Sequence, residues 1–420
     1  MERKYCGTCR GERGCKDCAS AVKTAEYTGI TGFFPEGTGT TGGTCFVGVP
    51  KKLFLAADLG TTTLAFVCTD EEGHVLSSYG TVNPQRSTSS DVVGRIDAAC
   101  HGDGEALKKQ IREALGKGFL FVLRKAGAVL EQVVQQVVQW ERLPVFGAVG
   151  GNTTMQHLLC GYPVEGLGAA PFRPYSLKEA AISFAELWEE SEGREAVPEN
   201  LKEAEFTIMP CLSAFVGGDA VAGAYGLSLG GDGRRKLLLD FGTNGELLLW
   251  QGEKLYVTST AMGSAFEGGH FAYAADMFRL IKKARECGVL DETGLLADPY
   301  FDASYEGLTQ ADVRCFQLAK GAIRAGIELL CRKADCLPEQ IEMVYVAGGI
   351  GTYCEEELLL AVGILPPEFV GKTKLVGNSC IGGLVRYLKE QGPVRSYEYE
   401  SISLAEEPEF EAIFYQSMDF

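Results

Sequence analysis

The chain has 420 residues, of which 46% are hydrophobic and 23% are charged. This balance is close to the average for globular proteins and excludes a disordered chain, a collagen and a coiled coil. The formal net charge of −17 repels phosphate backbones, so no nucleic-acid partner is expected. The sequence shows no apolar run of about 20 residues and no signal sequence, which predicts a cytoplasmic protein without a membrane partner.

Residues 1–50 differ from the rest of the chain. They are rich in Gly and Thr, poor in aliphatic residues, and contain Cys6, Cys9, Cys15, Cys18 and Cys45. Such a segment cannot bury a core of its own, so we expect a bound metal to hold it together.

The spacing of these cysteines supports two interpretations. Cys9, Cys15 and Cys18 with the distant Cys45 resemble a ferredoxin loop with one residue added, which would bind a 2Fe–2S cluster and leave Cys6 unused. Alternatively, Cys6, Cys9, Cys15 and Cys18 ligate one centre, either a 4Fe–4S cluster or zinc. The five-residue gap between the two Cys-x₂-Cys pairs is short for zinc, so the sequence favours iron–sulfur. The remaining, scattered cysteines are interpreted as buried thiols.

The first half of the remaining chain alternates strand and helix patterns. In chain order we expect strands at 53–58, 65–69 and 74–79, a helix over about 103–142 and a strand at 145–149. Residues 150–154 then lead into a helix that continues through Leu159. Residues 176–204 are acidic, and their pattern predicts a solvent-facing helical segment.

The second half repeats this alternation. In chain order we expect a strand at 206–210, a small-residue helix at 220–227, a bent hairpin at 235–249, a helix at about 309–334, a strand at 343–347, and a helix after 377–383 that reaches about Glu390. The acidic tail after Arg395 is interpreted as a solvated region of strand and loop.

An internal repeat organises the chain. Residues 55–65 and 237–247 each contain an apolar strand, the sequence Asp-x-Gly-Thr, and a second apolar strand. A single repeat at such a long distance predicts two similar α/β lobes rather than a solenoid. We therefore expect three parts: a metal-binding segment at 1–50, a first lobe at 51–205 and a second lobe at 206–420.

The repeated turn has the chemistry of a phosphate loop. Glycine permits a tight turn whose backbone N–H groups and hydroxyls face a phosphate, and the aspartate can hold hydrated Mg²⁺ or orient a water. The candidate phosphate-binding residues are Gly60, Thr61, Thr62, Thr63, Gly242, Thr243 and Asn244, and the candidate catalytic carboxylates are Asp58 and Asp240. Two such loops facing each other would hold the β- and γ-phosphates of ATP.

Two further motifs have competing interpretations. Asp219 follows two glycines and precedes a helix, so it is either a helix N-cap or a third catalytic carboxylate. Gly348, Gly349 and Gly351 follow a buried strand. They allow either close approach of a nucleotide to the backbone or a plain turn from strand to helix.

The paired loops resemble those of the actin-like ATPase superfamily, which includes sugar kinases, acetate kinase and heat-shock chaperone ATPases. The resemblance implies an α/β, two-lobed fold of duplicated ribonuclease-H-like lobes, preceded here by the small metal-binding segment. It also implies phosphate loops at 58–63 and 240–246 and an adenosine loop at 348–351.

A narrower resemblance concerns the ATPase domain of the reductive activators of corrinoid proteins. The motifs that carry it are collinear and lie at 58–63, 83–85, 91–96, 150–155, 170–174, 217–219, 240–246, 265–268 and 376–379. The resemblance implies an ATPase that delivers a low-potential electron from an iron–sulfur cluster to a corrinoid protein, or a similar metalloprotein, and returns Co(II) to Co(I). The alternatives are a small-molecule kinase with a zinc knuckle and a nucleotide sensor without catalysis. A homodimer is left open.

Overall fold

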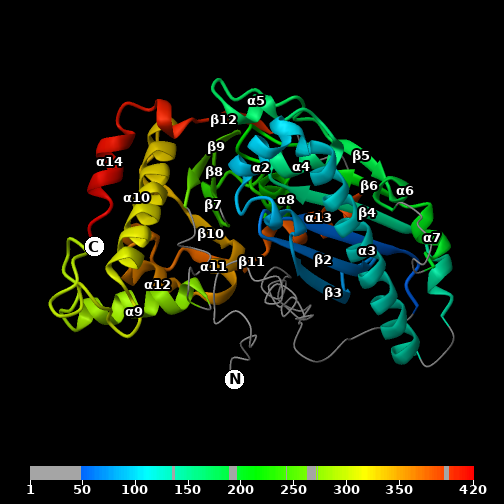
Figure 1. Cartoon of the computed structure of the whole chain (residues 1–420), viewed down its shortest axis with the longest axis horizontal. Helices are drawn as coiled ribbons and strands as arrows, with labels where there is room; N and C mark the ends of the chain where they lie inside the picture. The colour runs from blue at the N-terminus through cyan, green and yellow to red at the C-terminus, as the bar shows by residue number, and fades with distance from the viewer. Residues whose placement is uncertain are drawn as a thin grey trace. The chain divides into compact units, whose positions relative to one another are not determined.

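The computed structural model describes residues 49–134, 138–188, 196–242, 244–262, 271, 273–391 and 397–420 (Figure 1). These residues divide after Ile208 into two compact units. We call them the first unit (residues 49–208) and the second unit (residues 209–420). Within the described ranges, no helix combines the length and the apolarity that a membrane span requires.

The first unit is built on one six-stranded sheet in the order β3-β2-β1-β4-β6-β5. Its strands are β1 (Leu53–Leu59), β2 (Thr63–Asp70), β3 (Val75–Val82), β4 (Val145–Gly151), β5 (Ala180–Ser183) and β6 (Glu205–Ile208). The strands β1, β2 and β3 form an antiparallel meander, while β1 also pairs in parallel with β4. The hairpin predicted around the Asp58 turn is therefore confirmed.

One long helix covers this sheet (Figure 1). The helices of the first unit are η2 (Pro84–Ser87), α2 (Val92–Ala98), the π-helical η3 (Ala99–Asp103), α3 (Gly104–Val134), η4 (Trp140–Arg142), α4 (Thr153–Cys160), α5 (Glu165–Gly168), α6 (Phe184–Leu187) and α7 (Glu199–Lys202). In α3, Ile111, Leu115 and Phe119 recur every four residues and are fully buried, as the helical pattern predicts. The ring of Phe119 stacks on Phe206 of β6, with 4.2 Å between centroids.

The prediction for residues 176–204 is wrong in part. The described residues of this stretch form the edge strand β5, which pairs antiparallel with β6, and the short helices α6 and α7. Ile182, Phe184 and Leu187 are buried rather than solvent-facing. The strand has only four residues, so its alternation is too brief to stand out among the acidic residues around it.

The second unit repeats the sheet of the first. Its strands are β7 (Lys236–Phe241), β8 (Asn244–Gln251), β9 (Lys254–Ala261), β10 (Met343–Ala347), β11 (Thr373–Gly377) and β12 (Glu398–Ser401), in the order β11-β10-β7-β8-β9-β12. The order β9-β8-β7-β10-β11 matches β3-β2-β1-β4-β6 of the first unit strand for strand. The internal repeat in the sequence is thus a repeat of topology, and the expected pair of related α/β sheets is confirmed.

Helices pack on this second sheet and on each other. They are α8 (Gly218–Gly226), α9 (Ala274–Glu286), α10 (Gln310–Lys333), η6 (Pro338–Gln340), α11 (Gly348–Tyr353), α12 (Glu356–Ala361), η7 (Pro367–Phe369), α13 (Ser379–Glu390), η8 (Leu404–Glu406) and α14 (Phe410–Gln416). The helix α10 packs against β9, and α8 packs against α13. The contact between α8 and α13 is close, because a Cβ on Gly383 would overlap the carbonyl oxygen of Ala222.

The structure corrects two predictions, one about the C-terminal tail and one about the burial of the scattered cysteines. The tail is more than strand and loop, because α14 forms after β12 and packs against α10 (Figure 1). The described cysteines are only partly buried as a group: Cys100, Cys287 and Cys315 are exposed. Residues 1–48, which include the five cysteines of the expected metal-binding segment, lie outside the described residues.

Candidate functional site

The Asp58 loop connects β1 to β2 at the carboxyl end of β1. Because β1 and β4 are parallel, Asp58 pairs with Gly150 and Leu59 with Gly151, so this loop lies beside the start of α4. A Cβ on Gly60 would come within 2.5 Å of the Thr63 carbonyl oxygen, and the turn therefore requires glycine. Ligands of α/β sheets bind at this carboxyl edge.

Side chains from three other segments hold the Asp58 loop. Asn83 Nδ2 donates to the Gly60 carbonyl at 2.9 Å, and Arg95 Nη2 donates to the Thr61 carbonyl at 2.6 Å. Asn152, the N-cap of α4, donates from Nδ2 to Thr61 Oγ1 at 2.9 Å. Thr61 is buried, whereas Thr63 is exposed and Asp58 is half-buried. The loop is consequently fixed by hydrogen bonds rather than by packing alone.

The Asp240 loop occupies the corresponding place in the second unit. Asp240 pairs with Ala347 of the parallel strand β10 and with Glu246 of the antiparallel strand β8. The Gly242 N–H donates to the Asn244 carbonyl at 2.9 Å and closes the turn. Thr243, the remaining predicted phosphate ligand of this loop, lies outside the described residues.

Ser379 contacts Asp240 directly and had no role in the predictions from sequence. It is the first residue of α13, which is capped by Asn378, and its hydroxyl donates to Asp240 Oδ2 at 2.7 Å. Desolvation raises the pKa of Asp240 to about 6, and this hydrogen bond opposes the rise. The signal in the sequence was the Gly377-Asn378-Ser379 turn after a strand, but 139 residues separate Ser379 from Asp240.

Replacing Ser379 by alanine tests this contact. Without the hydroxyl, the ionised Asp240 carboxylate loses a hydrogen bond, and its pKa is expected to rise by about 1 unit. For the ATPase that the sequence predicts, the acid limb of the pH dependence of turnover should then move to higher pH by the same amount. The matched control is Ser77→Ala, since Ser77 is a buried serine of the first unit that donates to the Val122 carbonyl at 2.5 Å. An unshifted acid limb in Ser379→Ala would contradict the assigned role.

The glycines at 348–351 form the junction of β10 and α11. Gly348 has φ +77°, and a Cβ there would overlap the Phe241 carbonyl oxygen and lie 3.1 Å from Asp240 Oδ1. A Cβ on Gly351 would overlap the Val346 carbonyl oxygen, whereas Gly349 is exposed and has open space around it. The predicted turn from strand to helix is present, and contact with adenosine stays a prediction.

The N-cap interpretation of Asp219 is wrong. Gly217 is the N-cap of α8, and Asp219 is the second residue of the helix. Its Oδ1 accepts from the Ala220 N–H at 2.8 Å. A carboxylate in the first turn is favoured by the helix dipole, which is a sufficient structural reason for an acidic residue here.

The donor sets of the two loops fit phosphate and Mg²⁺. The Asp58 loop carries a carboxylate and threonine hydroxyls, and the Asp240 loop carries a carboxylate beside a serine hydroxyl, which are the hard oxygen ligands that Mg²⁺ prefers. Gly60 lies in the Asp58 loop, where a Cβ would clash with the Thr63 carbonyl oxygen. Gly348 lies beside the Asp240 loop, where a Cβ would clash with the Phe241 carbonyl oxygen. No ligand set for an iron–sulfur cluster can be described in the same way. In the described part of the chain, no group of three His, Cys, Asp or Glu side chains is placed to bind a metal.

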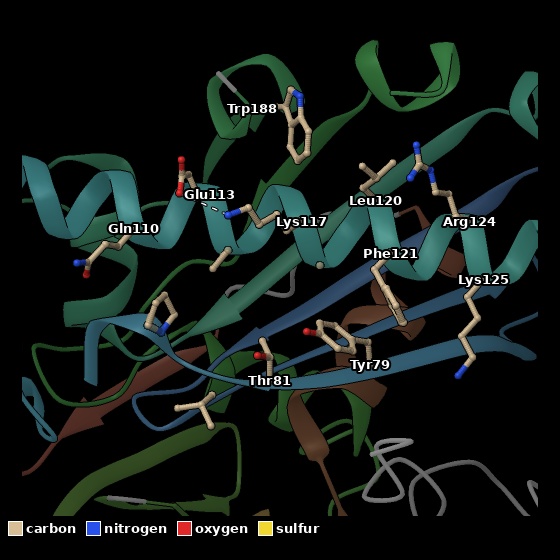
Figure 2. Close-up of a pocket in the computed structure, with 14 residues that line it drawn as sticks. Tyr79, Thr81, Gln110, Glu113, Lys117, Leu120, Phe121, Arg124, Lys125 and Trp188 are labelled. Atoms are coloured by element: carbon tan, nitrogen blue, oxygen red, sulfur yellow. Dashed lines mark ion pairs between the residues drawn. The ribbon is translucent and has the colours of Figure 1, made fainter. Parts of the chain in front are cut away.

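A pocket of about 950 Å³ lies elsewhere in the first unit, between α3 and the edge strand β3 (Figure 2). Figure 2 shows Phe121 pointing from α3 toward Tyr79, and their ring centroids are 4.5 Å apart. On the same helix, Lys117 forms an ion pair with Glu113 at 3.6 Å. None of the site residues predicted from sequence lines this pocket, but Val82 of its lining pairs with Thr63 at the end of the Asp58 loop.

The two related sheets, each with an Asp-x-Gly-Thr loop at the end of its central strand, define the actin-like class of folds. Comparison with family models agrees, since the RACo middle region matches residues 53–231 and the C-terminal domain of RACo, the ASKHA domain, matches residues 234–276 and 304–420. Together these matches cover most of the chain. It belongs to the RACo family, the reductive activators of corrinoid proteins, as the sequence motifs predict.

Two known proteins illustrate the relationship. The chain is similar to the corrinoid activation enzyme RamQ of Eubacterium limosum, with 28% identity over 401 residues, covering 80% of this chain and 64% of RamQ. It therefore spans less than two thirds of the length of that relative. The solved structure of a reductive activator for corrinoid, iron–sulfur protein has a TM-score of 0.69 at 23% identity, covering 89% of this chain and 67% of that one. The second comparison supports the fold.

Proposed function

We propose that the protein is an ATP-dependent reductive activator of a corrinoid protein. ATP hydrolysis would be coupled to delivery of a low-potential electron from an iron–sulfur cluster, which returns the partner's Co(II) to Co(I). The observation that carries this proposal is the pair of equivalent Asp-x-Gly-Thr loops in a chain of the RACo family. In this proposal residues 1–50 hold the cluster, residues 51–205 form the first ATPase lobe, and residues 206–420 form the second.

In this proposal each loop has a defined task. Mg²⁺ bound with ATP supplies charge neutralisation at the phosphates. The phosphates are bound by backbone and hydroxyl groups of Gly60, Thr61, Thr62, Thr63, Gly242, Thr243 and Asn244. The adenosine is approached by Gly348, Gly349 and Gly351. Metal and water are positioned by Asp58, Asp240 and Asp219, of which Asp240 is assigned to the water.

Asp240 is the residue proposed to move a proton. With a pKa of about 6, its carboxylate is ionised at neutral pH but remains basic enough to accept a proton from a water. Because Ser379 already donates to Oδ2, the oxygen assigned to this task is Oδ1. Since both Oδ1 and the backbone of Gly348 lie at the same strand edge, the proton acceptor is adjacent to the proposed adenosine loop.

The cysteine segment is proposed to hold the electron donor. The cluster is 2Fe–2S or 4Fe–4S, with Cys9, Cys15 and Cys18 as ligands and either Cys6 or Cys45 as the fourth. The electron leaves the reduced cluster, which becomes oxidised by one electron, and reduces the corrinoid cobalt from Co(II) to Co(I). A reductant outside the chain then returns the cluster to its reduced state.

The test is the metal content of the full-length protein purified without oxygen. We expect iron and acid-labile sulfide in matching amounts, and the number of irons per chain distinguishes the two cluster types. The double variant Cys9→Ser, Cys15→Ser should lose at least about nine tenths of the iron, since each cluster needs four thiolates, but keep its affinity for Mg·ATP. The control is Cys315→Ser, at an exposed cysteine of α10. Zinc without sulfide would contradict electron delivery and favour the kinase alternative.

A further inference from the structure

Arg95 is a fully buried guanidinium beneath the Asp58 loop. It lies in α2, is completely inaccessible to solvent, and donates hydrogen bonds to the Thr61 and Ser89 carbonyls, to Gln85 Oε1 and to Met155 Sδ. All of these acceptors are neutral. Burial lowers the pKa of Arg95 to about 10, while the Asp91 carboxylate opposes this, so the side chain keeps its charge at neutral pH. Burying a cation without a carboxylate bonded to it is costly, which calls for a specific purpose.

The bond from Arg95 fixes the orientation of a peptide in the loop. In a trans peptide the carbonyl of one residue and the N–H of the next point in opposite directions. Because Arg95 holds the Thr61 carbonyl, the Thr62 N–H is directed away from the guanidinium. In the same way, the bond from Asn83 to the Gly60 carbonyl directs the Thr61 N–H away from Asn83. These are two of the amides that the sequence predicts to face phosphate.

A buried amide joins the two donors into one network. Gln85 Oε1 accepts from Arg95 Nη1 at 3.3 Å, and the Gln85 N–H donates to Asn83 Oδ1 at 3.0 Å. Gln85 Nε2 in turn donates to the Leu107 carbonyl of α3 at 2.9 Å. Asn83, Gln85 and Arg95 are all fully buried. The network therefore anchors the loop to the long helix of the first unit.

We propose that Arg95 is a positioning residue that presets the Asp58 loop for phosphate binding. It holds the Thr61 peptide in the orientation that presents the Thr62 amide, and its charge adds a positive potential on the buried side of the loop. Arg95 contacts the loop and not the nucleotide, so its effect on binding acts through Thr61. The assignment of the ligand as nucleotide phosphate rests on the proposed function.

The test compares Arg95→Ala with Arg112→Ala in the full chain. Arg112 is a matched control because its Nε also donates to a main-chain carbonyl of the first unit, that of Leu159 at 2.9 Å, but not to the loop. Amide hydrogen exchange is measured without nucleotide, and Mg·ATP binding is measured separately. We expect both variants to lower the melting temperature. Only Arg95→Ala should speed exchange at Asn83, whose N–H donates to the Thr62 carbonyl of the loop at 2.9 Å, and weaken Mg·ATP binding, each by roughly 10- to 100-fold. Ethylguanidinium at millimolar concentration, which fits the vacated space, should restore both.

Several results would overturn the role of Arg95. Exchange at Asn83 equal to that of the wild type in Arg95→Ala would do so, and so would equal acceleration in Arg112→Ala. If Arg95→Ala does not fold, Arg95→Lys gives the same comparison, because it keeps the charge but loses the planar fork. A wild-type protein that does not bind Mg·ATP would contradict the proposed function instead, while the exchange comparison still decides whether Arg95 holds the loop.

Discussion

Replacing Asp240 by asparagine is expected to reduce ATP turnover at least about 100-fold, because the amide cannot accept the proton from water. The iron content of the protein should not change, since the cluster is proposed to lie in residues 1–50. Turnover of the wild type should itself fall as the pH drops below 6, where Asp240 becomes protonated. The measurements are phosphate release across pH and iron analysis of the same preparations.

The same substitution is expected to stabilise the fold. The pKa of Asp240 is raised from 3.8 to about 6, so ionisation is less favourable in the folded than in the unfolded chain. Its contribution to stability is lost as the pH rises from 3.8 to 6, and at pH 8 the cost is up to about 3 kcal/mol. Asp240→Asn should therefore unfold at higher denaturant concentration than the wild type at pH 8, and this difference should shrink toward pH 4.5.

Asp232→Asn is the control for the effect on turnover. Asp232 is a surface carboxylate of the second unit that pairs with Arg234 and Lys236. Its replacement should leave turnover unchanged. Full turnover in Asp240→Asn would contradict the catalytic role, and loss of iron in that variant would contradict separate tasks for the cluster and the ATPase.

Replacing Gly348 by alanine is expected to be the most destabilising single change in the site. The residue has φ +77°, which is unfavourable for alanine, and the added Cβ would overlap the Phe241 carbonyl oxygen. The Phe241 carbonyl belongs to the backbone of a strand, so it cannot move aside as a flexible side chain would. We expect a loss of about 3 kcal/mol or more, or roughly 10 °C in melting temperature.

Gly349→Ala is the adjacent control. A Cβ at this position meets no atom within 4 Å, so stability should stay within about 0.5 kcal/mol of the wild type. The two variants also separate folding from binding. If the backbone at 349 approaches adenosine, Gly349→Ala should weaken Mg·ATP binding while the melting temperature is unchanged. Unchanged binding would remove Gly349 from the proposed adenosine loop, and an unchanged melting temperature in Gly348→Ala would contradict the steric argument.

The sequence predicts the central strands well because their signals are local. The run at 343–347 matches β10 residue for residue, since a continuous apolar stretch followed by glycine is typical of a buried parallel strand. The two Asp-x-Gly-Thr turns were also visible, because each depends on adjacent residues only. The duplication of the sheet could then be predicted from two similar hairpins.

The contacts that complete each loop could not be predicted in this way. Ser379 reaches Asp240, and Arg95 reaches Thr61, only after the strands have set the register between distant segments. A serine after Gly-Asn, or an arginine in a helix, is usually exposed to solvent, so the local sequence does not mark either residue as a buried contact. Burial of Arg95 is a tertiary property, because its partners come from three separate segments, around Thr61, Gln85 and Met155. The strand β5 was missed because four residues carry too little periodicity.

The close contact of α8 and α13 joins the two helices mechanically. Gly383 lies against the backbone of Ala222, and a Cβ on Gly223 would come within 2.6 Å of Ser379 Oγ, so the two helices touch without an intervening side chain from either glycine. Farther along, Arg386 of α13 donates to the Tyr225 carbonyl of α8 and links the helices again. A rigid contact of this kind transmits movement instead of damping it. A shift of α8, whose first turn carries Asp219, would therefore move Ser379 relative to Asp240. A change of less than 1 Å is enough to lengthen the bond from Ser379 to Asp240 Oδ2 beyond hydrogen-bonding distance. The basicity of Asp240 therefore depends on the position of α8.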